Sequence, residues 1–199
     1  DLAQNSIALI LREAQHARRG RPARIIAKVN ALLDQPVIEV LYRASQSGVE
    51  IDLIVRGACA LRPGVRGLSQ RIRVRSVIGR FLEHSRIFYF ENGGSPDVYL
   101  GSADWMPRNL YERVEVLFPV KDAEHRPRVV EILLHYLRDT SKSRMLRADG
   151  SYVRAYHTNG HRNRNATRFS VQEFFVEHRD IRPDPRIEEA GRPVAADAA

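Results

Sequence analysis

The sequence predicts a single α/β domain in which helices flank a mixed β-sheet and a C-terminal tail follows. Three observations support this fold class. Residues 24–55 alternate strand, helix and strand with short connections, which is typical of a βαβ unit with parallel strands and a right-handed crossover. Two later strands are joined through Asn92-Gly93-Gly94, a strong turn signal. Residues 123–138 carry apolar side chains at helical spacing, which indicates an amphipathic helix.

The first half of the chain contains the βαβ unit and one more strand. The expected segments are a helix over 2–19, a strand over 24–30, a helix from Asp34 to Gly48, and strands over 49–55 and 72–78. Gly20 ends the first helix, and Asp34 is placed to cap the second. In the strand 72–78, Arg73 and Arg75 share one face and the apolar side chains share the other.

The second half adds a hairpin, a further strand and two helices. The expected segments are strands over 86–90, 98–102 and 112–120, the helix over 123–138, and a short helix over 169–178. Residues 181–199 combine prolines, alanines and charged residues without an apolar pattern, so we expect them to form a mobile tail.

Composition narrows the class of protein. A hydrophobic content of 43% excludes a wholly disordered chain, and a net charge of +8 favours polyanionic partners. Cys59 is the only cysteine, which rules out an internal disulfide and fits a reducing compartment. No apolar run reaches the roughly 18 residues of a membrane span, and no signal peptide is present, so we expect a soluble, cytoplasmic protein. The chain opens with Asp1 inside a predicted helix, which favours a fragment of a longer protein.

Arginines are concentrated in residues 56–86, a segment with eight arginines, no lysine and one acid, Glu83. They are Arg56, Arg62, Arg66, Arg71, Arg73, Arg75, Arg80 and Arg86. Because the guanidinium fork matches phosphate oxygens, this segment indicates phosphate contact. A genome that favours arginine over lysine is the competing explanation. It does not account for Arg56, which stands at the C-terminal end of a buried strand, where open α/β sheets bind ligands.

A histidine and a Gly-Ser strand end suggest phosphoryl chemistry nearby. His-Ser-Arg at 84–86 precedes one strand, and Gly-Ser-Ala-Asp at 101–104 closes the next. His84 is able to shuttle a proton or take a phosphoryl group, the neighbouring cation to neutralise phosphate charge, and the Ser102 hydroxyl to donate to a phosphate oxygen. Arg113, just beyond, is placed to face the same site. A polar residue at the start of a strand is the plainer explanation of the histidine.

Several long runs of this sequence resemble the second C-terminal domain of the polyphosphate kinase family. They are ARIIAKVNAL, DLIVRGACALRPGV, IRVRSVIGRFLEHSRIFYF, VYLGSADWMPRNL and RVEVLFPV, in the family's order. The resemblance covers about residues 20–154. It implies that residues 1–20 end the preceding domain, that 21–154 form a catalytic domain with a phospholipase-D-like α/β fold, and that 155–199 are a partly disordered extension.

The resemblance also implies an activity, the reversible transfer of the terminal phosphate of ATP to polyphosphate. Arg56 and His84 would contact the nucleotide phosphates of ATP or ADP, with Arg113 beside them, and His84 would assist the transfer. The family's phosphohistidine and its magnesium ligands lie in the preceding domain, so this chain holds no metal and is expected to have no kinase turnover alone. The full-length enzyme is expected to form homo-oligomers in the cytoplasm, with peripheral attachment to the inner membrane left open.

Other functions remain open at this point. A homodimeric phosphodiesterase or nuclease would use one His-x-basic motif from each subunit, although Arg86 stands where phospholipase-D enzymes carry lysine. A polyanion-binding module driven by net charge is a second alternative, but the aromatic platforms usual for single strands are lacking, so nucleic acid is not expected. A fragment that needs its other domains in order to fold is the third. Arg71, Arg73 and Arg75 are candidates for guiding a polyphosphate chain beyond the site.

Overall fold

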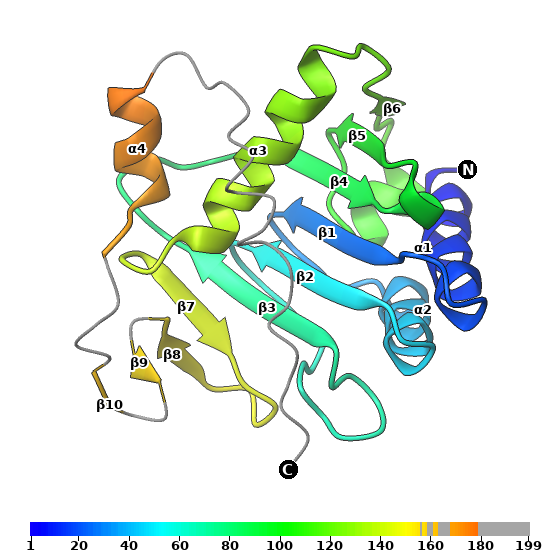
Figure 1. The fold of residues 1–199 in the computed structure, drawn as a ribbon, viewed down its shortest axis with the longest axis horizontal. Coiled ribbons are helices and arrows are strands. Elements are labelled where there is room, and N and C mark those ends of the chain that lie inside the picture. Colours follow the sequence, from blue (N-terminus) through cyan, green and yellow to red (C-terminus); the bar gives the residue numbers. More distant parts are fainter. Residues whose placement is uncertain (156, 159–160, 163–167, 179–199) are drawn as a thin grey trace.

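The computed structural model describes residues 1–155, 157–158, 161–162 and 168–178. Its centre is an eight-stranded sheet with the order β6-β5-β4-β1-β2-β3-β7-β8 (Figure 1). The strands are β1 Arg24–Val29, β2 Glu50–Val55, β3 Ile72–Val77, β4 Arg86–Phe90, β5 Asp97–Gly101, β6 Leu117–Pro119, β7 Ser143–Leu146 and β8 Tyr152–Arg154. β1, β2 and β3 pair in parallel and the other neighbours are antiparallel. The mixed sheet predicted from the sequence is therefore confirmed.

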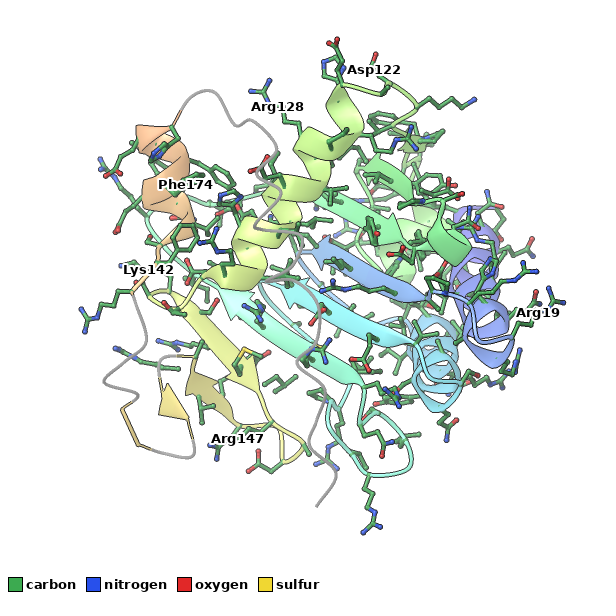
Figure 2. All side chains as sticks on the ribbon, in the orientation of Figure 1. Arg19, Asp122, Arg128, Lys142, Arg147 and Phe174 are labelled. Atoms are coloured by element: carbon green, nitrogen blue, oxygen red, sulfur yellow. The ribbon has the colours of Figure 1, made fainter. Side chains whose placement is uncertain are left out.

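Different helices cover the two faces of the sheet (Figure 1). The helices are α1 Leu2–Arg18, α2 Gln35–Gln46, α3 His125–Arg138 and α4 Val171–Glu177, and a short β-ribbon joins β9 His157–Thr158 to β10 His161–Arg162. α1 and α2 pack on the face that carries Ile25 and Leu53, and α3 packs on the opposite face, with Ile26 and Ile54. Phe174 of α4, labelled in Figure 2, stacks on the buried His135 of α3. Thus α4 packs against α3.

The βαβ unit forms as the sequence predicts. Asp34 caps α2, because its carboxylate accepts a hydrogen bond from the Val37 amide at 3.1 Å. β1 and β2 pair in register from Arg24 opposite Glu50 to Val29 opposite Val55. This register brings the residues that follow β1 and β2 to the same edge of the sheet.

A buried carboxyl group joins α1 to the sheet. Glu13 is fully buried and accepts hydrogen bonds from the backbone amides of Arg24, at 3.2 Å, and Asn92, at 2.9 Å. Asn92 begins the turn between β4 and β5, where Asn92, Gly93 and Gly94 all have positive φ. Burial raises the pKa of Glu13 to about 7. The hairpin turn predicted at this position is confirmed, and α1 helps to hold it.

The strand expected over 112–120 is wrong in its first part. Residues Arg108–Glu112 form one turn of π-helix, and only Leu117–Pro119 belong to the sheet. β5 ends at Gly101, which pairs with Leu117, so the residues before Leu117 have no strand beside them. Val114 is fully exposed for the same reason.

Two strands of the eight-stranded sheet were not expected from the sequence. β7 pairs antiparallel with β3, and β8 pairs with β7. Both are short and lack an alternating apolar pattern, which left them without a signal in the sequence. The short helix expected over 169–178 is confirmed as α4. The tail expected over 181–199 lies outside the described residues.

Candidate functional site

Four strand ends that carry chemistry meet at one edge of the sheet. β1 and β2 end there, β4 begins there, and β5 ends there, since Arg86 pairs with Gly101 and Lys28 pairs with Ile87. It is also the edge at which parallel α/β sheets bind ligands. This topology places Arg56, His84 and residues 101–104 at or next to the same edge of the sheet.

Two residues at this edge, which follow adjacent strands, carry buried donors without acceptors. Asn30 directly follows β1 and Arg56 directly follows β2, so the strand register places them opposite one another. Within the described part of the chain, Arg56 Nη1 and Asn30 Nδ2 are buried and have no hydrogen-bond partner. Leaving such donors unpaired is costly unless a ligand or water supplies acceptors. The pair is therefore suited to an acceptor-rich anion such as phosphate.

The backbone around Arg56 is fixed. Its amide donates to the Val29 carbonyl at 3.2 Å, and its carbonyl accepts from the Ser76 hydroxyl at 2.9 Å. The next residue, Gly57, lies so close to the chain after β1 that a Cβ there would be 3.0 Å from the Asn30 carbonyl oxygen. Contacts with β1 and β3 thus fix the backbone from which the Arg56 side chain extends.

Lys28 is a functional candidate that sequence reasoning missed. This side chain is buried in β1; its Nζ lies 3.2 Å from Glu83 Oε2 and donates to Ser85 Oγ at 2.9 Å. The ammonium also sits 4.7 Å from the centre of the Tyr136 ring, a cation–π contact. Burial lowers the pKa of Lys28, and the Glu83 carboxylate opposes that shift. One of only three lysines in the chain, standing inside an apolar strand, was the available signal.

His84 lies in the segment between β3 and β4, on the same side as Lys28. Its side chain is exposed, and its carbonyl accepts from Arg86 Nη1 at 2.6 Å. The residues on either side of it, Glu83 and Ser85, both contact Lys28. Glu83 lines a small pocket together with Lys28 and Arg56. The structure therefore connects His84 and Arg56 through one buried cluster.

The neighbouring polar residues are bound to each other. Arg86 and the buried Asp104 form a two-pronged ion pair, with Nε–Oδ1 at 3.1 Å and Nη2–Oδ2 at 2.9 Å. Asp104 also accepts a hydrogen bond from the backbone amide of Asn30 at 2.6 Å. The cation at 86 is therefore already paired with a protein carboxylate, which does not favour its expected role in neutralising phosphate charge.

The Ser102 hydroxyl is likewise occupied. It donates to Glu115 and accepts from the Val116 amide at 3.1 Å, so its expected role as a donor to phosphate is not supported. The hydrogen bond from Ser102 also holds the pKa of Glu115 below its usual range.

Arg113 lies apart from Arg56 and His84. It is exposed and lines a shallow depression with Asn109, Tyr111 and Glu115, next to the start of α1. Arg113 therefore lines this depression, while Arg56 lines the small pocket beside Lys28 and Glu83.

The arginines proposed to guide polyphosphate are paired within the sheet. Arg71 bonds Glu50 at 2.6 Å, and Arg73 bonds both Glu50, at 2.8 Å, and Asp52, at 2.7 Å. Burial raises the pKa of Asp52, but the hydrogen bonds and charges of Arg73 and Arg24 outweigh it and leave the pKa low. Arg75 donates to the carbonyl of Leu137 at the end of α3. These cations hold the sheet and α3 together, and this arrangement does not support a polyanion path.

Metal clusters and membrane-spanning helices were both sought among the described residues. No group of three His, Cys, Asp or Glu side chains suited to a metal ion occurs among the described residues. None of the helices that the structure describes is long and apolar enough to cross a membrane.

Comparison with known proteins settles the family. The family model for polyphosphate kinase C-terminal domain 2 matches residues 1–167. The chain belongs to this family. Polyphosphate kinase from Pseudomonas aeruginosa is 55% identical over 164 residues, which is 82% of this chain and 24% of that protein. The Thermosynechococcus vestitus polyphosphate kinase is 56% identical over 151 residues, 76% of this chain and 21% of that protein. The resemblance inferred from the sequence is confirmed.

Solved structures agree with the family. The crystal structure of polyphosphate kinase from Porphyromonas gingivalis superposes with a TM-score of 0.80 at 40% identity, covering 87% of this chain and 26% of that chain. A phospholipase D family member from Salmonella typhimurium aligns at 13% identity and a TM-score of 0.48, too low a likeness to bear on chemistry. This chain spans about a quarter of the length of its polyphosphate kinase relatives.

Proposed function

We propose that this chain is the nucleotide-phosphate-binding part of a polyphosphate kinase that reversibly transfers the terminal phosphate of ATP to polyphosphate. The observation that carries the proposal is the pair of buried, unpartnered donors, Arg56 Nη1 and Asn30 Nδ2, at the carboxyl edge of the sheet. Phosphate oxygens supply the acceptors that the protein does not. Family membership supports ATP or ADP, and polyphosphate, as the molecules that bring them.

Each predicted site residue has a role in this proposal. Arg56 binds a phosphate oxygen of the nucleotide, and Asn30 donates a second hydrogen bond beside it. His84 assists the transfer as a proton donor or charge partner, from an exposed position next to the Lys28–Glu83 pair. Arg113 reaches the same phosphates only from a separate depression, so its part is that of a more distant cation.

The rest of the enzyme supplies what these residues lack. We propose that the phosphorylated histidine and the magnesium ligands lie outside this chain. Residues 1–20 are proposed to end the preceding domain, 21–154 to form the catalytic domain and 155–199 to extend it. A homo-oligomeric enzyme working in the cytoplasm is part of the same proposal. The chain alone is expected to show no growth of polyphosphate from ATP.

The phosphodiesterase alternative has less support. Such an enzyme needs the cation of its His-x-basic motif and the Gly-Ser hydroxyl free for the phosphodiester. In this chain Arg86 is paired with Asp104, and Ser102 is bonded to Glu115. Both groups would have to leave a protein partner before they reached a substrate.

Calorimetric titration of the chain with ATP at moderate salt tests the proposal. Arg56→Ala and His84→Ala are each expected to weaken ATP binding about tenfold or more, equivalent to about 1.4 kcal/mol for a charge-assisted contact. Arg66→Ala is the charge-matched control, because Arg66 is exposed on the loop before β3. Equal losses in all three variants would indicate binding by net charge alone and would overturn the assignment.

A further inference from the structure

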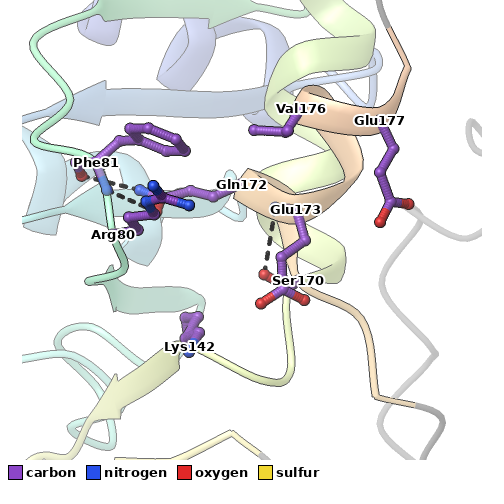
Figure 3. Close-up of a pocket in the computed structure, with 8 residues that line it drawn as sticks. All are labelled: Arg80, Phe81, Lys142, Ser170, Gln172, Glu173, Val176 and Glu177. Carbon is purple, nitrogen blue, oxygen red and sulfur yellow. Dashed lines mark hydrogen bonds between the residues drawn. The ribbon is translucent and has the colours of Figure 1, made fainter.

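A side chain of α4 holds the segment that carries His84. Gln172 is only 7% exposed, and its amide pairs with both backbone groups of Phe81. The Phe81 amide donates to Gln172 Oε1 at 3.0 Å, and Gln172 Nε2 donates to the Phe81 carbonyl at 3.0 Å (Figure 3). In this way the glutamine side chain bonds the segment as the backbone of a neighbouring strand would.

The same glutamine reaches the residue beside His84. Gln172 Nε2 also donates to Glu83 Oε1 at 2.6 Å, and the other carboxylate oxygen of Glu83 pairs with Lys28 at 3.2 Å. Lys28 in turn donates to Ser85 Oγ. A continuous chain of polar contacts therefore runs from α4 to β1 and binds the residues immediately before and after His84.

These polar contacts, and not burial, hold the segment. Its large apolar side chains face outward: Ile78 is 59% exposed, Phe81 48% and Leu82 75%. Apolar burial therefore contributes little to its position. The backbone approaches Gln172 so closely at Gly79 that an added Cβ would lie 2.2 Å from Gln172 Oε1. Gly79 thus allows the contact, and Gln172 is the main fixed point on the α4 side.

We propose that Gln172 is a positioning residue that, through Glu83 and Lys28, fixes His84 for contact with the phosphates of a nucleotide. This inference rests on the proposed function, because it requires His84 to touch the nucleotide. α4 lies beyond residues 1–167, the span matched by the family model. The positioning contact is therefore supplied by a part of the chain outside that span.

Two measurements on the Gln172→Ala variant test the inference. Amide hydrogen exchange reports on the segment itself, and the Phe81 amide is expected to exchange about tenfold faster or more once its acceptor is gone. Calorimetry with ATP reports on the site, and affinity is expected to fall about threefold or more, as for coupling between contacting residues. Glu177→Ala, at an exposed position on the same helix, is the matched control and should change neither quantity.

A double-mutant cycle separates positioning from general stabilisation. If Gln172 acts through His84, Gln172→Ala has no further effect on ATP affinity in a His84→Ala background, yet keeps its full effect in an Arg56→Ala background. Equal effects in both backgrounds would mean a structural role and would overturn the inference, as would unchanged exchange of the Phe81 amide. If His84→Ala itself leaves ATP binding unchanged while Arg56→Ala weakens it, the nucleotide contact proposed for His84 fails, and the positioning role falls with it even where exchange is faster.

Discussion

Replacing Lys28 by methionine is the most informative perturbation of this site. Methionine keeps the length and apolar stem of the side chain and removes only the ammonium. The ammonium contacts Glu83, Ser85 and the Tyr136 ring from a position that is 5% exposed. Its loss leaves the Glu83 carboxylate, whose side chain is 17% exposed, facing an apolar neighbour.

The size of the effect follows from the partner left behind. Removing one member of a buried ion pair costs about 3–5 kcal/mol, because an uncompensated charge remains. Glu83 keeps its hydrogen bond from Gln172 and some access to water, so we expect Lys28→Met to lower the free energy of unfolding by about 2–3 kcal/mol. Adding Glu83→Gln removes the stranded charge, and the double variant is expected to recover most of that loss.

Urea unfolding of the chain at neutral pH measures these changes in the free energy of unfolding, with Lys121→Met as the control at an exposed lysine. ATP titration of the double variant completes the experiment. Stability should return while ATP affinity stays reduced, since the ammonium that ties Ser85 to β1 is still missing. If Lys28→Met proved as stable as the parent chain, the reasoning about the buried pair would be refuted.

Two other carboxyl groups yield predictions about stability. The pKa of Glu13 is raised by burial from its usual 4.5 to about 7, so the folded chain binds its proton more tightly than the unfolded chain. Stability from this group is therefore present below pH ~4.5 and is lost as pH rises toward 7, by at most about 3 kcal/mol. Urea unfolding across that range should show this slope in the parent and not in Glu13→Gln; equal slopes would contradict the assignment. Asp104→Asn should cost about 3 kcal/mol, because the Arg86 side chain, only 16% exposed, would be left without its carboxylate. A thermal midpoint that does not move would show that the pair is not a net stabiliser.

The parts of the fold that were predictable depend on local signals. The βαβ unit has a capping Asp34 and β-branched strands, and the hairpin has its Asn-Gly-Gly turn. Arg56 was placed correctly at the sheet edge because a strand that ends in a glycine is visible in the sequence. His84 was expected beside Arg56 only through the resemblance to the polyphosphate kinase family.

The parts that were missed depend on distant partners. The segment before Leu117 carries β-branched residues, but β5 ends too early to pair with it. Arg73 looked like a free cation because its partners, Glu50 and Asp52, lie on another strand. Gln172 is separated from Phe81 by about ninety residues, and no local pattern marks it as the group that holds the His84 segment.

The pattern of paired and unpaired groups explains why this edge suits binding better than bond-breaking. Transfer of a phosphoryl group needs an attacking and a leaving oxygen in line, with cations and donors on the oxygens between them. At this edge the hydroxyl of Ser102 and the guanidinium of Arg86 are bound to carboxylates, so neither is free to attack or to neutralise. At the same edge, the buried Arg56 Nη1 and Asn30 Nδ2 have no hydrogen-bond partner in the described part of the chain. Donors on one side of a phosphate hold it and draw off its charge, and the reacting groups must then approach from the side that this chain does not cover.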